Sequence, residues 1–147
     1  MKKILICLLL GFTFSYNGEG AVNYAKIYCN KYNPNYNNYK NSKDGNEAAN
    51  FVSQCISVGG RLDLTGCEGL DDKGMIKKNS DLKKCLTLKG WKKTNKISKG
   101  YPMFLRYGSF PMIITDVQRS GIIFCSHNYD RCDGRVSFNS VDIYSPS

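Results

Sequence analysis

Residues 46–60, N-E-A-A-N-F-V-S-Q-C-I-S-V-G-G, predict the helix around which the rest of the chain is organised. Asn46 and Glu47 supply a side-chain acceptor and a carboxylate where a helix begins with unpaired N–H groups. The apolar side chains that follow recur every three or four residues, as on a buried helix face: Ala48, Phe51, Val52, Cys55 and Ile56. Gly59 and Gly60 are expected to end the helix, because glycine adopts the left-handed closing conformation without steric cost.

Two further helices are predicted on either side of the central one. In residues 21–32 the tyrosines recur every four residues beside smaller apolar side chains, which indicates an amphipathic helix that Asn33-Pro34 ends. A short helix later in the chain has one apolar face, formed by Leu82, Cys85 and Leu86.

From Met103 onward the sequence is typical of β-strands. Residues 103–105 predict a short strand, and the apolar runs 112–117 and 122–127 predict a hairpin around residues 118–121. Further strands are expected at residues 135–138 and 141–144. Helices followed by strands indicate an α+β domain.

The N-terminus predicts an exported protein. Lys2 and Lys3 precede an apolar run of signal-peptide length, which is shorter than the roughly 20 apolar residues that span a bilayer. Small side chains permit cleavage before Tyr16 or slightly later. We therefore expect residues 1–20 to be a signal peptide, residues 21–147 to form one domain, and the protein to be secreted. An uncleaved membrane anchor is the alternative.

Six cysteines remain after the expected removal of Cys7, and an even number in an exported chain predicts up to three disulfides. Six cysteines allow 15 pairings, which the sequence does not separate. The spacing lacks Cys-x-x-Cys pairs and the chain has one histidine, so no structural metal is expected, and nothing indicates a cofactor. The disulfide candidates are Cys29, Cys55, Cys67, Cys85, Cys125 and Cys132.

The chain carries a formal net charge of +9, much of it in one segment. Between Lys73 and Lys99 lie ten lysines and one acidic residue, Asp81. Such a segment is either a solvated face or a surface that associates with anionic polymers or lipids. Nucleic acid is not indicated, because the segment has no arginine and only Trp91 as an aromatic platform.

The central helix resembles the signature of the putative amidase domain family. These papain-like cysteine hydrolases carry Asp-Cys-Thr/Ala-Asn-Phe/Tyr-Val/Ile-Ser-Gln-Cys followed by Gly-Gly. Residues 50–55, N-F-V-S-Q-C, match this signature, as do the two glycines, whereas Glu47 replaces the aspartate and Ala48 occupies the position of the nucleophilic cysteine. The family's Ala-Val-x-Tyr-Ala and Asn-Pro-x-Tyr are matched by Ala21, Val22, Tyr24, Ala25, Asn33, Pro34 and Tyr36.

The resemblance implies a papain-like amidase fold, with N-terminal helices packed on an antiparallel β-sheet, and positions for two further site residues. The family's His-x-x-Ile-Val aligns with residues 110–114, so Phe110 replaces the histidine, or Pro111 does if the alignment shifts by one. Residues 126–128 align with the second strand end and make His127 the retained third position. If Val117 lies opposite Ile122, Phe110 faces a position near Tyr129 and shares a cleft with His127.

These replacements predict a protein that has lost its catalytic groups. A helix N-terminus activates a thiol, but a methyl group neither attacks a carbonyl nor becomes activated. We expect a secreted pseudoenzyme that binds a peptide, glycopeptide or cell-wall polymer in a cleft formed by Glu47, Ala48, Phe110, His127 and Asn128. The alternatives are an active amidase or peptidase with an unrecognised nucleophile such as Ser53, and a basic protein that binds anionic surfaces.

Overall fold

The computed structural model describes residues 15–147, which form an α+β domain and so confirm the predicted fold class. The helical elements come first: α1 (Gly18–Tyr28), α2 (Glu47–Gln54) with its π-helical continuation η1 (Cys55–Gly59), and α3 (Asn79–Leu88). The strands are β1 (Lys92–Thr94), β2 (Pro102–Leu105), β3 (Pro111–Gln118), β4 (Gly121–Ser126), β5 (Arg131–Val136) and β6 (Val141–Ser145), with a short 3-10 helix, η2 (Phe138–Ser140), before β6.

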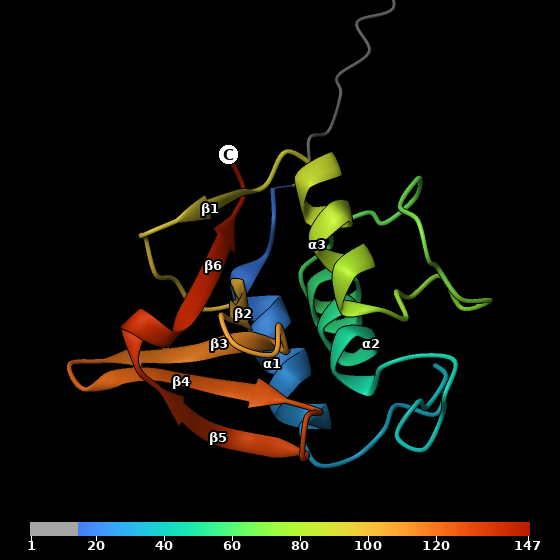
Figure 1. The fold of residues 1–147 in the computed structure, drawn as a ribbon, viewed down its shortest axis with the longest axis horizontal. Coiled ribbons are helices and arrows are strands. Elements are labelled where there is room, and N and C mark those ends of the chain that lie inside the picture. The colour runs from blue at the N-terminus through green and yellow to red at the C-terminus, as the bar shows by residue number, and fades with distance from the viewer. Residues whose placement is uncertain (1–14) are drawn as a thin grey trace, which may run out of the picture.

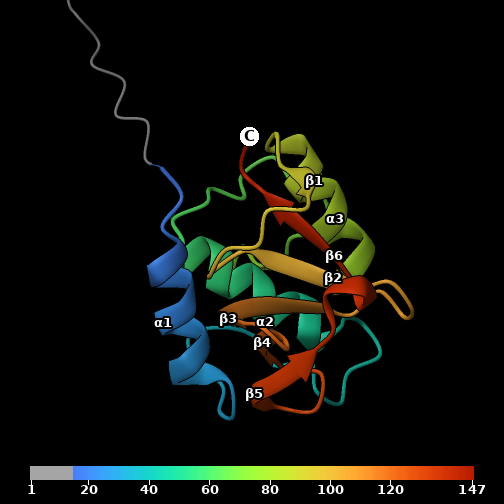
Figure 2. The ribbon, with the colours of Figure 1, turned by 90° about the vertical axis from the view of Figure 1, so that its left-hand side faces the viewer.

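The strands form one antiparallel sheet in the order β1-β6-β2-β3-β4-β5. Figures 1 and 2 show the helical half of the chain beside this sheet. The predicted hairpin is confirmed, with Val117 opposite Ile122. Strand β5 begins earlier than predicted, and β1 was not predicted because Lys92 and Lys93 give it no apolar pattern.

The two faces of the sheet belong to two hydrophobic clusters. Phe104, Ile113 and Cys125 pack in the larger cluster with residues of all three α-helices. Their chain neighbours Met103 and Met112 pack in a second cluster, formed by sheet residues on the opposite face. This alternation is what a strand imposes, because successive side chains point to opposite faces. It fixes which residues of β3 and β4 face α2.

The central helix ends near Gly59 and Gly60, but the left-handed conformation expected there falls one residue later. Gly60 is right-handed (φ −85°, ψ −9°), and Arg61 has a φ of 63°. A Cβ at Gly59 would lie 2.4 Å from the Gly20 carbonyl oxygen, and one at Gly60 would lie 2.2 Å from a ring carbon of Tyr16. The two glycines are therefore needed for close packing of η1 against the N-terminal segment, rather than for a special φ.

The first described residues belong to the folded domain. The Tyr16 hydroxyl donates to the Gly100 carbonyl (2.5 Å), and its ring meets Trp91 edge-on at 4.7 Å. Asn17 caps α1 by accepting from the Gly20 amide, so this helix begins three residues before Ala21. The rest of the predicted signal peptide, residues 1–14, lies outside the described residues. Within residues 15–147, no helix has the length and apolar character needed to cross a membrane.

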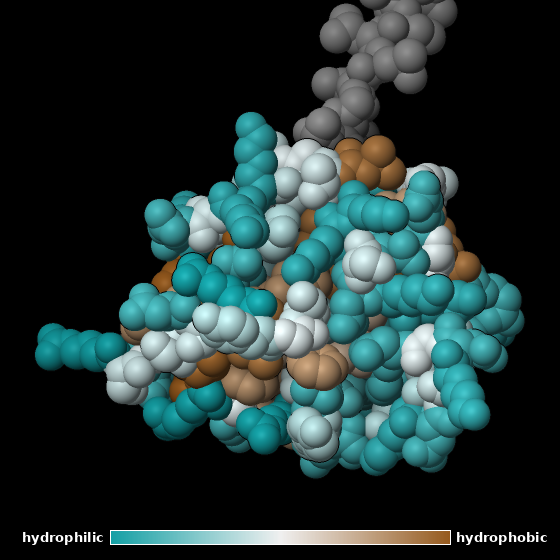
Figure 3. Space-filling view, viewed as in Figure 1, coloured by the Kyte–Doolittle hydropathy of each residue, from teal (hydrophilic) through white to brown (hydrophobic). Residues whose placement is uncertain are grey.

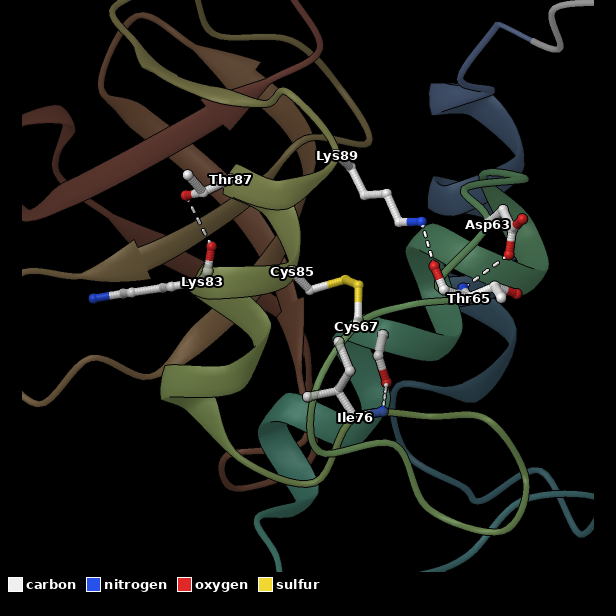
Figure 4. Close-up of a disulfide and its surroundings, with 9 residues drawn as sticks. Asp63, Thr65, Cys67, Ile76, Lys83, Cys85, Thr87 and Lys89 are labelled. Atoms are coloured by element: carbon white, nitrogen blue, oxygen red, sulfur yellow. Dashed lines mark hydrogen bonds between the residues drawn. A yellow bond between two sulfur atoms is a disulfide. The ribbon is translucent and has the colours of Figure 1, made fainter.

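Two disulfides join segments that are distant in the sequence. Cys29–Cys132 ties the end of α1 to β5, and Cys67–Cys85 ties the loop after η1 to α3 (Figure 4). The same loop is held to α3 by Lys89, whose ammonium donates to the Thr65 carbonyl (2.6 Å). The other two disulfide candidates, Cys55 and Cys125, form no disulfide in the structure and are buried in the larger cluster.

Candidate functional site

The N-terminus of α2 is capped as its sequence predicts. The Asn46 side-chain oxygen accepts from the amides of Ala48 (2.8 Å) and Ala49 (3.3 Å). The Asn46 amide donates to the Lys77 carbonyl (2.6 Å), which fixes the loop before the helix against the lysine-rich segment. The cap satisfies helix N–H groups that would otherwise lack partners. Ala48 is therefore held in the first turn of α2, where the residue is 3% exposed.

His127 follows β4 and reaches the start of α2. His127 lies two residues after Cys125, so its side chain points to the same face of the sheet, toward the helices. Its ring stacks on Phe51, with the ring centroids 3.8 Å apart. Nδ1 lies 2.8 Å from a Glu47 carboxylate oxygen, and Nε2 lies 2.5 Å from the Tyr28 carbonyl oxygen. Both partners are acceptors, so the ring that satisfies them donates from both nitrogens. With the ring in this form, the contact between His127 and Glu47 is a buried ion pair.

Glu47 also holds the loop between α1 and α2. Its second carboxylate oxygen accepts from the Tyr39 amide (2.6 Å). The Tyr39 hydroxyl in turn donates to Asp71 (3.0 Å). Burial, together with this hydrogen bond to a carboxylate, raises the pKa of Tyr39 to about 12, so the hydroxyl remains a donor at neutral pH. Tyr39 therefore anchors the loop twice, through its backbone amide and through its side-chain hydroxyl.

A cleft of about 580 Å³ opens beside this ion pair, lined by residues 39–42, 45–48 and 127–130. Its lining residues belong to the loop before α2, the start of α2 and the turn that leads from β4 to β5. Four of the predicted cleft residues line it together: Glu47, Ala48, His127 and Asn128. The fifth, Phe110, does not line it.

A β-bulge explains the placement of Phe110. The pairing of β3 with β4 shifts by one residue between Ile114 and Asp116, so that Ile113 lies opposite Cys125. Pro111 lies opposite Phe104, a residue of the helix-facing cluster. Because alternate strand residues share a face, Pro111 rather than Phe110 is on the side of α2. Of the two positions that the resemblance aligned with the family's histidine, the register therefore favours Pro111.

The turn after His127 has an unusual backbone that the sequence did not predict. Tyr129 and Asp130 have φ values of 72° and 48°, which non-glycine residues seldom adopt. The Asp130 carboxylate accepts from Lys40 (2.8 Å) and from the Tyr32 hydroxyl (2.8 Å). Burial opposes ionisation of Asp130, but these hydrogen bonds and the charge of Lys40 outweigh it and lower the pKa of the carboxyl.

The polar residues of the N-F-V-S-Q-C motif form a buried hydrogen-bond network. The Gln54 amide donates to the Asn50 side-chain oxygen (2.7 Å), and the Tyr24 hydroxyl donates to Gln54 (2.7 Å). Ser53 donates to the Asn50 carbonyl (2.8 Å) and accepts from the Ile76 amide (3.1 Å). Ser53 is fully buried and does not line the cleft, so it has no access to a ligand there.

Another hollow, of about 470 Å³, lies at the other end of the sheet, where Lys93 and Arg106 each lie 3.1 Å from Asp142. None of the predicted site residues lines it. Within residues 15–147, no group of three or more His, Cys, Asp or Glu side chains is placed to hold a metal ion.

Acid is expected to destabilise the domain through three carboxylates. Burial opposes the ionisation of Asp71, Asp130 and Asp142, but hydrogen bonds from amides, hydroxyls and cationic side chains outweigh it and lower each pKa. A lowered folded-state pKa stabilises the protein at neutral pH, and this stabilisation is lost as the pH falls below about 4. Thermal unfolding followed by circular dichroism should show a constant melting temperature near neutrality and a fall in acid.

In Asp71→Asn the melting temperature should be lower at pH 7 and should fall less steeply in acid. An unchanged dependence of the melting temperature on acid pH would contradict the role of Asp71.

Comparison with known proteins gives two matches. Residues 15–101 match the model of a family described as a putative amidase domain, a stretch that ends before β2. A stretch of 50 residues is 42% identical to the uncharacterized protein YhbB of Bacillus subtilis (strain 168) and covers 34% of this chain but only 14% of that protein. No solved structure matches, so the papain-like fold stays a prediction.

Proposed function

Since this chain belongs to the putative amidase domain family, we propose that it is a secreted member that binds a peptide, glycopeptide or cell-wall fragment in the cleft at the start of α2 without hydrolysing it. The observation that carries the proposal is the residue at the start of this helix. Ala48 lines the cleft at the position aligned with the family's nucleophilic cysteine. A methyl group forms no covalent intermediate with an amide carbonyl.

The state of His127 supports the same proposal. A general base needs a ring nitrogen within reach of the group that it deprotonates. Both nitrogens of His127 already face protein acceptors, and its side chain is buried. His127 is the single histidine of the chain, so the chain offers no other imidazole. Among residues 15–147, the surroundings of Ala48 thus combine a ligand-sized cleft with a methyl group and an imidazole whose two nitrogens are already engaged, which supports binding without hydrolysis.

Cosedimentation with purified bacterial cell walls tests this function, with mass spectrometry of the supernatant as the second readout. We expect the protein in the pellet and no released fragments. Asn41→Arg places a long side chain at the exposed rim of the cleft and should reduce pelleting. Asn35→Arg makes the same change on the exposed loop outside the cleft and should not. Released fragments, or equal pelleting of both variants, would overturn the proposal.

Restoring the two missing groups tests the alignment. Ala48→Cys places a thiol at the N-terminus of α2, where a nearby imidazole should favour the thiolate. We expect the double variant Ala48→Cys with Pro111→His to react with iodoacetamide at a lower pH than two others. These are Ala48→Cys alone and the double variant Ala48→Cys with Phe110→His. The native free thiols should contribute little to this reaction, because Cys55 and Cys125 are buried. Burial also raises the pKa of the Cys125 thiol to about 11. Identical pH profiles in all three variants would show that the aligned positions do not meet.

Export is tested by N-terminal sequencing of the protein recovered from the culture medium. Cleavage before Tyr16 keeps the hydrogen bond to Gly100 and the Asn17 cap of α1, whereas cleavage after Gly20 removes both. We therefore expect Tyr16 as the first residue. A mature chain that begins at Ala21 would contradict this, and protein that remains in the cell pellet would contradict secretion.

The lysine-rich segment favours a second candidate, which is binding to an anionic surface. Ten lysines lie between Lys73 and Lys99. Three of them form salt bridges within the described residues, and their side chains are 62–68% exposed: Lys84, Lys93 and Lys99. The face in Figure 3, which carries α3, is mostly hydrophilic. Binding through these lysines would weaken with salt and would not respond to Asn41→Arg. The same cosedimentation assay therefore separates the two functions.

A further inference from the structure

The charged side chains that line the cleft are paired with one another. Lys40 lies 2.8 Å from Asp130, and His127 lies 2.8 Å from Glu47. A charged ligand group would find no unmatched charge in this lining. Taking a partner from the buried Glu47–His127 pair would leave a buried charge uncompensated, which is unfavourable. The part of the ligand that enters the cleft is therefore best matched by an uncharged group.

Side-chain amides supply the unused hydrogen-bonding capacity of the cleft. Asn41 and Asn128 line it, and no residue among 15–147 hydrogen-bonds to their side-chain amides. Asn46 uses its side-chain oxygen to cap α2, which leaves its NH₂ group as a donor. An amide offers both donors and acceptors without charge, and this suits hydroxyl and acetamido groups.

Tyr129 supplies an aromatic surface at the edge of the same cleft. Its side chain is 82% exposed, and its backbone is held in the left-handed region. The Arg131 guanidinium lies 5.9 Å from the ring centroid. Non-glycine residues in such a conformation carry strain that is often found at ligand clamps. A tyrosine has an apolar ring and a polar tip, so it can contact both the C–H face and the hydroxyls of a sugar.

We propose that the cleft recognises an uncharged sugar residue, which stacks on Tyr129 and hydrogen-bonds to the side-chain amides of Asn41, Asn46 and Asn128. This inference rests on the proposed function and names the part of the ligand that the cleft holds. A peptide alone fits less well, because peptides are usually held by a free strand edge or by apolar side-chain pockets. The cleft is lined instead by loops, a turn and a helix start.

Titration of ¹⁵N-labelled protein with N,N′,N″-triacetylchitotriose tests the inference, with a neutral blocked tripeptide as the second probe. We expect the sugar to shift the backbone amide signals of residues 127–131 and the tripeptide to leave them unchanged. Tyr129→Ala should weaken sugar binding about tenfold, which corresponds to roughly 1.4 kcal/mol. Tyr107→Ala is the matched control, because Tyr107 is 91% exposed and does not line the cleft.

Competition on cell walls separates failure of this inference from failure of the proposed function. Release of wall-bound protein by the chitotriose, lost in Tyr129→Ala, supports both. Release by the tripeptide but not by the chitotriose overturns the sugar inference and leaves the proposed function standing. Signal shifts with the chitotriose in a protein that does not bind walls overturn the proposed function alone. The absence of both responses overturns both.

Discussion

His127→Ala is expected to lower the free energy of unfolding by about 3–5 kcal/mol, the range for removing one partner of a buried ion pair. The change leaves the carboxylate of Glu47, whose side chain is 6% exposed, without its cationic partner. It also removes the ring that stacks on Phe51 and leaves the Tyr28 carbonyl oxygen without a donor. Urea unfolding at pH 7, followed by circular dichroism, measures the effect.

A double-mutant cycle assigns this loss to the pair rather than to packing. His127→Leu with Glu47→Leu removes both charges and fills part of the space, a replacement that is often neutral for buried ion pairs. We expect the double variant to be clearly more stable than the sum of the two single changes predicts. A loss below about 1 kcal/mol in His127→Ala, or strictly additive effects, would show that the pair is not formed in solution.

The local rules predicted the elements that position the site. The Asn46 cap, the apolar spacing of α2 and the β3–β4 hairpin are each encoded within about fifteen residues, and all are present in the structure. The Glu47–His127 pair joins residues that are 80 positions apart, so no local pattern signals it. The resemblance placed both residues in one cleft but not in contact, and the acidic residue that begins the helix is already explained by a favourable helix dipole.

The bulge at Thr115 shows how a small irregularity limits a prediction from register. Counting residues back from Val117 opposite Ile122 assumes an unbroken ladder. The extra residue shifts the pairing by one before Ile113 is reached. A one-residue slip also exchanges the two faces of a strand. The sequence therefore placed the hairpin correctly but left Phe110 and Pro111 unresolved, and the pairing of Pro111 with Phe104 shows only that Pro111 lies on the helix-facing side of the sheet.

The match to the family signature has a structural explanation that does not require catalysis. Asn50, Ser53 and Gln54 are buried and hydrogen-bonded to one another or to neighbouring segments. Removing one member of such a network leaves buried polar groups without partners, which is costly in any folded protein. The motif residues hold α2 in place, so their presence is compatible with an alanine at the first turn of the helix.

Removing the Cys29–Cys132 disulfide is expected to be the other large effect. The bridge joins residues 103 positions apart, and the entropy model assigns about 4.7 kcal/mol to closing a loop of about 100 residues. The Cys67–Cys85 bridge spans 18 positions, and the same model gives about 3 kcal/mol for a loop of about 15 residues. The double variant Cys29→Ala with Cys132→Ala should therefore lose more stability in urea than Cys67→Ala with Cys85→Ala.

The longer bridge also supports the cleft, so its loss should have a second, local effect. Cys29 follows Tyr28, whose carbonyl accepts from His127, and the Cys132 carbonyl accepts from the Cys125 thiol (2.9 Å). Without the bridge, the end of α1, which contacts the His127 ring, is no longer covalently tied to β5. We expect amide hydrogen exchange of residues 127–130 to quicken in the Cys29–Cys132 double variant and to stay near the native rate in the Cys67–Cys85 one. Equal exchange in both would mean that noncovalent packing alone holds the turn that carries Tyr129.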